Sequence, residues 1–244
     1  MKYSFVITYF KRAELLNNTL VSFKHFYGAR NDYEILILED KKNVLDTIEH
    51  EALLNVLGRF ELPIVHKELE FDNYSCPCSA MNYGVDIANG QYIILTNPEC
   101  MHSVDILKGF DEEFGKNPNV YIVASCLNIV KCTKEIENFS DFKYAAREWY
   151  QLSGGKHNRC LNWCTSLSKV NYMDIGGFNE EYDKGLGRAD VVFAKMVQQK
   201  LPFVLRDDLI SWHQSHGREH QKPNHSKLVS NNYTCRIFTS RFKK

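Results

Sequence analysis

Hydrophobic positions recur with two different periods along the first hundred residues. Short runs rich in Val, Ile, Leu and Tyr alternate with longer segments whose apolar residues return every three or four positions. The first pattern predicts strands and the second predicts amphipathic helices. The expected strands are 3–9, 34–38, 64–66 and 92–96, and the expected helices are about 12–26, 44–57 and 79–88.

This alternation of strands and helices indicates βαβ units. The unbroken Ile-Leu-Ile-Leu run at 35–38 suits a strand covered on both faces, as central parallel strands are. We therefore predict an α/β fold with a mixed, mostly parallel central sheet flanked by helices. After a further strand at 121–124 we expect an irregular acidic and aromatic stretch to Tyr150. A loop at 153–158 follows, of a kind that often forms a substrate lid.

Composition places the chain among ordinary globular proteins. It has 244 residues, of which 44% are hydrophobic, so one large domain can bury a sizeable core. Disorder, collagen and coiled coil are excluded, and we expect a single domain over residues 1–216. The 30 basic and 30 acidic residues give a net charge of zero, so no overall basic field indicates a nucleic-acid partner.

The apolar stretches are far shorter than the roughly 20 residues that a membrane-spanning helix needs. The amino terminus runs straight into a strand-like segment and lacks the pattern of a secretory signal, which predicts a cytoplasmic protein. The eight cysteines are then expected to be reduced and mostly buried. Neither Cys76-Pro77-Cys78 nor the pair Cys160 and Cys164 has the spacing of a tandem zinc site.

Polar residues that follow the predicted strands are the first candidates for a binding site, because ligands of open α/β sheets bind at the carboxyl ends of strands. They lie at 8–12, 39–40 and 97–99. Asp40 has two interpretations that position alone leaves equal: it binds a ribose or a base, or it caps the next helix. Arg12 either pairs with a phosphate or is simply exposed.

Three segments together carry a family resemblance. Residues 82–99 read N-Y-G-V-D-I-A-N-G-Q-Y-I-I-L-T-N-P-E, residues 5–12 read F-V-I-T-Y-F-K-R, and I-G-G-F-N-E-E-Y at 175–182 precedes G-R-A-D at 187–190. In this order and spacing the three blocks resemble the family 2 inverting glycosyltransferases of the GT-A fold, which use nucleotide sugars. The resemblance covers residues 3 to about 216. It implies a transferase that moves a hexosyl or pentosyl group from a nucleoside-diphosphate sugar, with a uridine donor expected, to a hydroxyl of a glycan or glycoconjugate with inversion.

The chain departs from the family where many relatives have D-x-D, because Asn97-Pro98-Glu99 leaves one carboxylate for a metal ion. Related enzymes place a metal-binding histidine late in the domain, which implies His213 as the partner of Glu99. We prefer it to His216, since a spacing of three in an extended segment would put the two rings on opposite faces. His102 is a further candidate. Carboxylate and imidazole ligands suit Mn²⁺ better than Mg²⁺.

The remaining roles also follow from the resemblance. Asp190 aligns with the family's catalytic base, although it could equally be a first-turn acid of a helix at 191–198, and Glu180 is the alternative base. The nucleotide-binding residues would be Thr8, Tyr9, Arg12, Asp40 and Asn97. Acceptor-binding residues are expected in the second half of the chain, where flat or polar side chains suit sugar rings: Trp149, His157, Trp163 and Glu180. Trp163 also has an alternative place in the core.

Two rival functions remain. The D-x-D position retains only Glu99, and Arg188-Ala189-Asp190 retains one acid where relatives commonly have two adjacent acids. Because both acidic motifs are thinned, the chain could be a non-catalytic module that binds a nucleotide sugar or a glycan. A nucleotidyltransferase is a weaker rival, since the G-G-F-N-E block has no role there. Residues 217–244 carry a net charge of +6, which suits docking to an anionic membrane, closure over the donor or a solvated helix.

Overall fold

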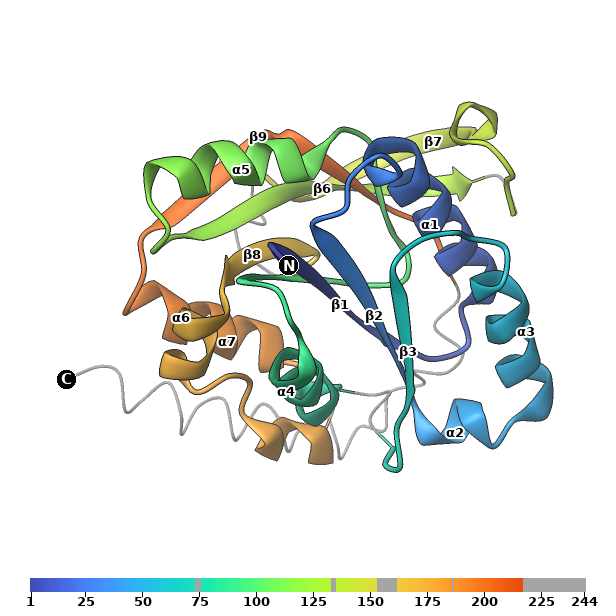
Figure 1. Cartoon of the computed structure of the whole chain (residues 1–244), viewed down its shortest axis with the longest axis horizontal. Coiled ribbons are helices and arrows are strands. Elements are labelled where there is room, and N and C mark those ends of the chain that lie inside the picture. The colour runs from blue at the N-terminus through green and yellow to red at the C-terminus, as the bar shows by residue number, and fades with distance from the viewer. Residues whose placement is uncertain (73–75, 133–134, 153–161, 186, 217–244) are drawn as a thin grey trace.

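The first half of the chain forms the parallel part of the central sheet. The structure, a computed structural model, describes residues 1–72, 76–132, 135–152, 162–185 and 187–216. The strands lie in the order β3-β2-β1-β4, and all three pairings are parallel (Figure 1). Their bounds are β1 (Tyr3–Tyr9), β2 (Tyr33–Glu39), β3 (Ile64–Glu68) and β4 (Tyr92–Thr96). Strands β1 and β4 have the predicted bounds, while β2 and β3 are slightly longer than predicted.

The helices between these strands are α1 (Ala13–Tyr27), α2 (Lys41–Val44), α3 (Thr47–Leu57) and α4 (Cys78–Ile87). The helix predicted over 44–57 is present as α3 but begins three residues later, and the short α2 before it was not predicted. The side chain of Asp40 accepts the backbone N–H of Lys42, and that of Asp46 accepts the N–H of Glu49. Each aspartate thus caps a helix start of its own.

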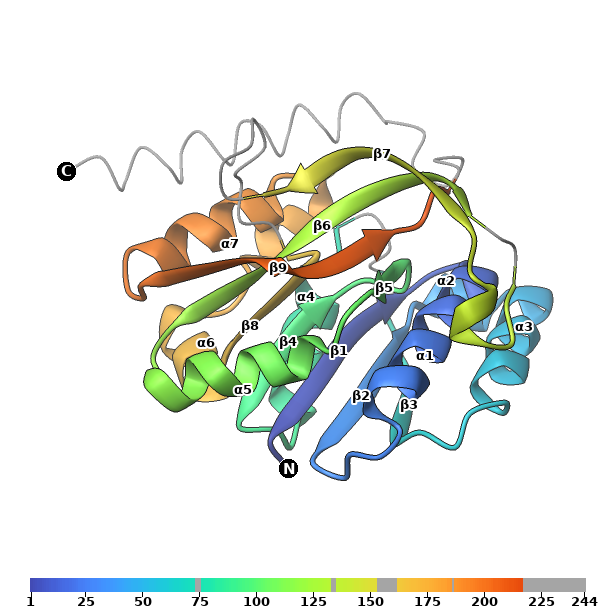
Figure 2. The same ribbon diagram turned by 90° about the horizontal axis from the view of Figure 1, so that it is seen from above.

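The second half of the chain extends the sheet in mixed orientation. In the described residues, nine strands form one sheet that continues from β4 through β8-β6-β9-β5, with β7 paired to β6 (Figure 2). The bounds are β5 (Cys100–His102), β6 (Tyr121–Cys132), β7 (Tyr144–Gln151), β8 (Cys164–Ser168) and β9 (Phe203–His213). The expectation of an irregular stretch to Tyr150 is therefore wrong for β7, which pairs with a strand β6 that runs past the predicted end at Ala124.

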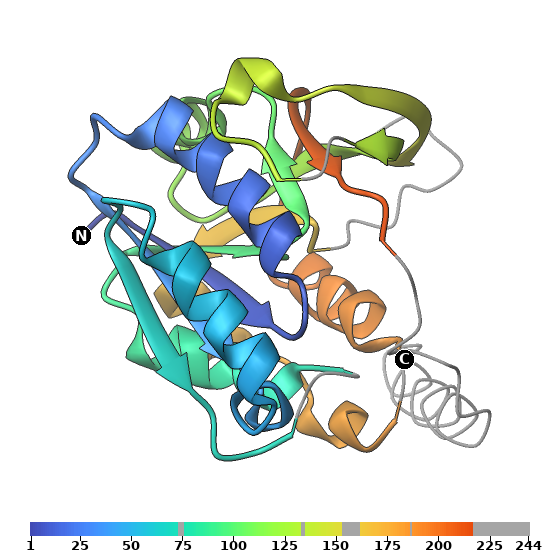
Figure 3. The ribbon, with the colours of Figure 1, turned by 90° about the vertical axis from the view of Figure 1, so that its right-hand side faces the viewer.

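Helices cover both faces of the sheet. Alternate residues of β1 point to opposite sides, so Phe5 and Ile7 pack in the cluster of α1, α3 and α5, whereas Val6 packs with α4, α6 and α7. Figure 3 shows α1 and α3 side by side over one face. The helices of the second half are α5 (Ile106–Lys116), α6 (Lys169–Ile175) and α7 (Ala189–Gln198). The predicted mixed α/β architecture is confirmed.

Some predictions fall on residues that the structure does not describe. The loop at 153–158, with the acceptor candidate His157, and the basic segment 217–244 lie outside the described residues. Membrane docking through that segment therefore stays a prediction. Within the described ranges, no helix combines the length and the apolar character that crossing a bilayer requires.

Candidate metal and donor site

The polar residues predicted from the strand ends gather at one edge of the sheet. Strands β2, β1 and β4 are adjacent and parallel, so the segments that follow them leave the sheet on the same side. Residues 8–12, Asp40 and 97–99 occupy this carboxyl edge. The predicted grouping of these three segments is thus present in the fold.

Glu99 is the centre of a compact cluster at this edge. Its side chain is almost fully buried, and Oε1 lies 2.5 Å from Nη1 of Arg12. The same oxygen is 3.6 Å from Nε2 of His213 and 3.6 Å from Nε2 of His216. One ligand atom from each of Glu99, His213 and His216 lies within 4.8 Å of the other two.

The charge on Glu99 is maintained by its neighbours. Burial by itself would raise the pKa of Glu99, but the Arg12 guanidinium and the hydrogen bonds from His213 and His216 hold that pKa well below its usual range. The second carboxylate oxygen, Oε2, is buried and has no hydrogen-bond partner in the described part of the chain. An anionic oxygen without a partner inside a cluster of imidazoles fits a site for a divalent cation.

Pairing between two strands brings Glu99 and His213 together. Strand β5 begins at Cys100 and pairs with the end of β9, so that Cys100 lies opposite His213. The backbone N–H of Gln214 donates to the Glu99 carbonyl oxygen at 3.0 Å. The fully buried Gln214 side chain donates to the Leu15 carbonyl oxygen and accepts from Asn18. Through Gln214, helix α1 therefore fixes both the segment that carries His213 and the segment that carries Glu99.

The His213 ring is oriented by its surroundings. Its Nδ1 donates to Oδ1 of Asn128 at 3.2 Å, which leaves Nε2 directed toward Glu99. Metal-binding histidines are commonly fixed through the second ring nitrogen in this way. The rings of Tyr150 and Trp163 lie against His213, with centroids at 5.1 Å and 4.7 Å.

The structure corrects the choice between the late histidines. We preferred His213 to His216 because an extended chain would place them on opposite faces, and this reason is wrong. Strand β9 ends at His213, so the alternation of the strand does not extend to His216, and both Nε2 atoms lie at the same distance from Glu99.

His102 does not belong to the cluster. It is fully buried among Phe5, Phe23 and Tyr27, and its Nδ1 is 2.6 Å from the Tyr27 hydroxyl. Burial lowers the pKa of His102 to about 3, so the ring is neutral. Its other nitrogen faces Cys164. His102 is therefore a structural residue of the core.

The predicted nucleotide-binding residues have distinct environments. Tyr9 is buried in the core, and its hydroxyl accepts the backbone N–H of Arg12 at 3.2 Å. Asp40 caps α2, while Thr8 and Asn97 are partly exposed. The adjacent Glu39 is fully buried, and its carboxylate accepts hydrogen bonds from three side chains: Asn43, His50 and His66.

Asp190 lies near the start of helix α7, which begins at the carboxyl edge of the sheet. It lies in the first turn of α7, three residues after Gly187, whose carbonyl oxygen is 4.0 Å from Sγ of Cys76, two residues before α4 begins. Helix α4 follows β3, so its start belongs to the same edge as the Glu99 cluster. The carboxylate accepts the backbone N–H of Val191 at 2.7 Å. The first-turn position is thus present, and the catalytic assignment stays a prediction.

Asn82, the first residue of the resemblance motif, has a structural role that sequence reasoning missed. Its amide nitrogen donates to the Phe178 carbonyl oxygen and to Glu180, and its oxygen accepts from the Phe178 N–H and the Tyr172 hydroxyl. This side chain therefore ties α4 to the G-G-F-N-E turn. Glu180, the alternative base and acceptor candidate, is exposed and bonded to Asn82.

Among the acceptor candidates, Trp149 lies in β7 and Trp163 immediately precedes β8. Trp149 is 36% exposed, and the next residue, Tyr150, is the one whose ring packs on Trp163. The Trp163 carbonyl oxygen accepts the Thr96 hydroxyl at 2.9 Å. The indole Nε1 of Trp163 is buried and has no partner among the described residues. Asn128 was not predicted for the site.

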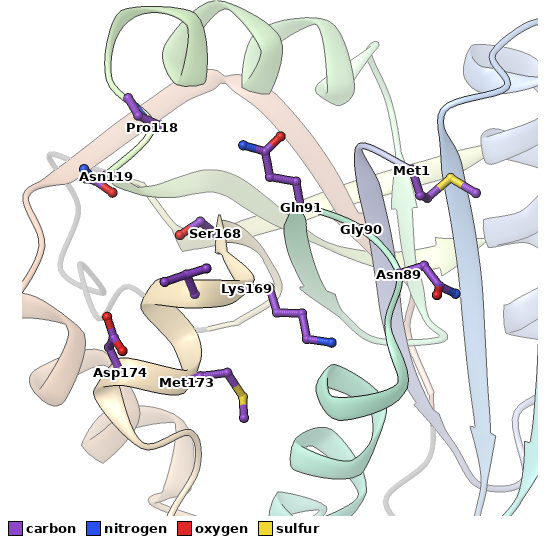
Figure 4. A pocket seen from close by; sticks show the side chains of 11 residues that line it. Met1, Asn89, Gly90, Gln91, Pro118, Asn119, Ser168, Lys169, Met173 and Asp174 are labelled. Carbon is purple, nitrogen blue, oxygen red and sulfur yellow. The ribbon is translucent and has the colours of Figure 1, made fainter.

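A pocket of about 720 Å³ lies elsewhere on the molecule. Figure 4 shows it beside the start of β4, the chain ahead of β6 and helix α6. It contains none of the predicted site residues, since it is lined from the amino edge of the sheet: Met1, Asn89, Gly90, Gln91, Pro118, Asn119, Ser168, Lys169, Val170, Met173 and Asp174.

Comparisons with solved structures identify the architecture. Residues 1–349 of S. aureus TarS, in complex with UDP-GlcNAc, match with a TM-score of 0.63 and 13% identity over 90% of this chain and 60% of that one. The mannosyltransferase PcManGT from Pyrobaculum calidifontis, with GDP-Man and Mn²⁺, matches with 0.61 and 12% over 90% and 59%. GalNAc-T7 with UDP, GalNAc and Mn²⁺ matches with 0.62 and 14% over 88% and 44%.

These likenesses define the class of fold. No family model matches the sequence, and no curated protein matches it either. The chain has the GT-A fold of the glycosyltransferases, as the resemblance implied. It spans about 60% of the length of TarS 1–349 and less of GalNAc-T7.

Proposed function

We propose that this chain is a metal-assisted glycosyltransferase. It moves a sugar from a nucleoside-diphosphate sugar, with uridine as the expected nucleoside, to a hydroxyl of a glycan or glycoconjugate with inversion. The observation that carries the proposal is the cluster of Glu99, His213 and His216 at the carboxyl edge of a GT-A sheet. Solved neighbours with this fold hold UDP-GlcNAc, or GDP-Man and Mn²⁺.

The three side chains suit a divalent cation. They offer one carboxylate and two imidazoles, a donor set that favours Mn²⁺ over Mg²⁺. Oε2 of Glu99, which has no partner within the described ranges, and the orientation of His213 by Asn128 agree with this assignment. A bound cation would supply Lewis-acid stabilisation of the charge that develops on the departing diphosphate.

The donor would lie across the ends of β1, β2 and β4. In this proposal Thr8 and Asp40 contact the nucleoside, while Asn97 and Arg12 contact the diphosphate. The buried Tyr9 has an indirect role, because its hydroxyl accepts the Arg12 N–H and so fixes the backbone of Arg12. The Arg12 guanidinium is the cationic group nearest to Glu99 and is suited to a phosphate oxygen.

Asp190 is the proposed base. An inverting transfer requires removal of the acceptor proton as the hydroxyl attacks the anomeric carbon opposite the leaving diphosphate. The carboxylate of Asp190 stands at the start of α7, on the same edge as the metal cluster. Glu180 is less suited to this role, because its carboxylate is engaged by Asn82 in the turn.

The acceptor would meet the aromatic wall beside His213. Trp163 and Tyr150 line this side, and the Nε1–H of Trp163, which has no partner among the described residues, would donate to a sugar hydroxyl. Trp149 and Glu180 are more peripheral acceptor candidates, since both are exposed.

A second function is favoured by one observation. Arg12 already neutralises Glu99, so the cluster is electrostatically satisfied without a cation. A non-catalytic module that binds a nucleotide sugar without metal would have this property. The two functions differ in whether diphosphate release depends on a metal ion.

The test is slow hydrolysis of a panel of nucleotide sugars by the purified chain. We expect free nucleoside diphosphate to be released from one donor with Mn²⁺ and not with chelator, and the Glu99→Gln variant to lose this release. Donor binding without release, in the presence of an acceptor panel as well, would instead support the binding module. Glu51→Gln, on the exposed side of α3, is the matched control.

A further inference from the structure

All three basic contacts of Glu99 converge on one of its two oxygens. Arg12, His213 and His216 face Oε1, and Oε2 is left without a partner in the described structure. The shortest of these contacts is the one with Arg12, at 2.5 Å. The Arg12 guanidinium therefore pairs with the carboxylate that a cation at this site would need as a ligand.

The backbone beneath Arg12 is held firmly. The preceding residue, Lys11, has a positive φ of 49°. Its N–H donates to Oδ1 of Asn43 at 2.9 Å, and its ammonium group pairs with Asp46. Asn43 is itself fixed by the buried carboxylate of Glu39. The turn between β1 and α1 thus presents Arg12 at a set position.

The Arg12 side chain has more freedom than its backbone. Its guanidinium stands on a flexible stem, and the side chain is 18% exposed, whereas that of Glu99 is 4% exposed. The described contacts of the guanidinium include no second carboxylate. Arg12 can therefore turn away from Glu99 while the Lys11 turn stays in place.

A guanidinium and a divalent cation cannot both approach one buried carboxylate without repelling each other. We infer that Arg12 acts as an exchangeable stand-in for the metal ion: it pairs with Glu99 in the empty site, and a cation displaces it toward the diphosphate of the donor. This inference rests on the proposed function and adds a coupling to it. The cation alone binds weakly, and the donor strengthens its binding by giving Arg12 a new anionic partner.

The experiment measures Mn²⁺ binding to the full chain by calorimetry, with and without uridine diphosphate. In the wild-type protein we expect uridine diphosphate to tighten Mn²⁺ binding by about 5–150-fold, the usual range of such couplings. In Arg12→Gln we expect Mn²⁺ alone to bind about tenfold more tightly than in the wild type, and most of the coupling to be lost. Arg59→Gln, at an exposed arginine paired with Glu135, is the matched control.

A second variant guards against a folding defect. Arg12→Lys keeps a positive charge near Glu99 and should give an intermediate Mn²⁺ affinity. Equal Mn²⁺ affinities of wild type and Arg12→Gln, both lost in Glu99→Gln, would overturn the exchange and leave the metal site standing. No Mn²⁺ binding in any of these folded variants would overturn the metal site and the exchange together.

Discussion

A buried carboxylate stays charged only when its neighbours compensate the loss of water, and Glu99 shows how this chain achieves it. Burial disfavours the anion, but Arg12, His213 and His216 together hold the pKa of Glu99 well below its usual range. The residue is therefore anionic at neutral pH. This is the state that a cation site or an arginine partner requires.

Asp190 gives a test at the scale of one residue. Asp190→Asn removes the negative charge and retains an oxygen that can accept the Val191 N–H. If Asp190 is the base, turnover should fall by about 10²–10⁴-fold while donor binding changes little. Steady-state kinetics and a donor-binding titration check this.

The control for that experiment is Asp174→Asn, an exposed position on α6. It should match the wild type in both measurements. Turnover of Asp190→Asn within a factor of two of the wild type would remove Asp190 from the mechanism and leave it as a first-turn acid of α7.

The sequence predicted the bounds of two central strands correctly. Strands β1 and β4 were predicted with their observed bounds, because continuous apolar runs with clear ends identify central strands. Strand β9 was not predicted, since Arg206, Asp207 and Asp208 interrupt its apolar pattern near a register shift against β6. Strand β5 has only three residues, too few for any period to appear.

The sequence predicted those residues of the candidate site that come soon after a strand or belong to the family motifs. Glu99 comes three residues after the end of β4, and the resemblance pointed to His213. The place of His216 depends on where β9 ends, which residue types do not reveal. Asn128 and Tyr150 reach His213 from β6 and β7, and such contacts between distant segments leave no local pattern.

Gly84 of α4, the first glycine of the 82–99 motif, allows a test at the scale of one element. A Cβ at this position would lie 2.5 Å from Cδ1 of Leu38 and 2.7 Å from Cγ1 of Val6. The glycine thus allows α4 to pack closely on the sheet. Gly84→Ala should destabilise the protein by about 1–3 kcal/mol through overpacking, despite the better helix propensity of alanine.

The matched variant is Gly115→Ala, an exposed glycine of α5 whose Cβ would meet no atom within 4 Å. It should stabilise the protein by about 0.5–1 kcal/mol. Urea unfolding of both variants measures the two changes. Stabilisation of the protein by Gly84→Ala would contradict the close packing of α4 on β1 and β2.

At the scale of the whole molecule, the two halves meet through charged and polar groups that are partly buried. Asp111 of α5 accepts from Lys2, Tyr3 and Arg30. Asp183 caps the start of α4 by accepting the N–H groups of Cys78 and Ser79. Each of these carboxylates joins segments about a hundred residues apart in the chain. Burial opposes the ionisation of Asp111, but the hydrogen bonds from Lys2, Arg30 and Tyr3 hold its pKa below the usual value, so stability should depend on its charge.

Glu34 provides the acid-stability prediction. It is buried and accepts from the Ser4 hydroxyl at 2.6 Å and from the Asn89 backbone N–H at 2.6 Å. Burial opposes its ionisation, but these hydrogen bonds hold the pKa of Glu34 below its usual value. The unfolded chain, with a glutamate pKa of about 4.3, then binds more protons than the folded one. The contribution of Glu34 is present above that pH and is lost as the pH falls through the folded pKa.

The measurement is the free energy of unfolding in urea between about pH 3 and pH 7. Glu34→Gln should be less stable than the wild type at neutral pH and should lose less stability on acidification, because one linked proton is removed. Glu51→Gln, at an exposed position of α3, should follow the wild-type curve. A Glu34→Gln curve parallel to that of the wild type would show that this carboxylate does not contribute to acid unfolding. The pH dependence would then have to come from other carboxylates whose pKa values are lowered in the fold, among them Glu39, Glu99 and Asp111.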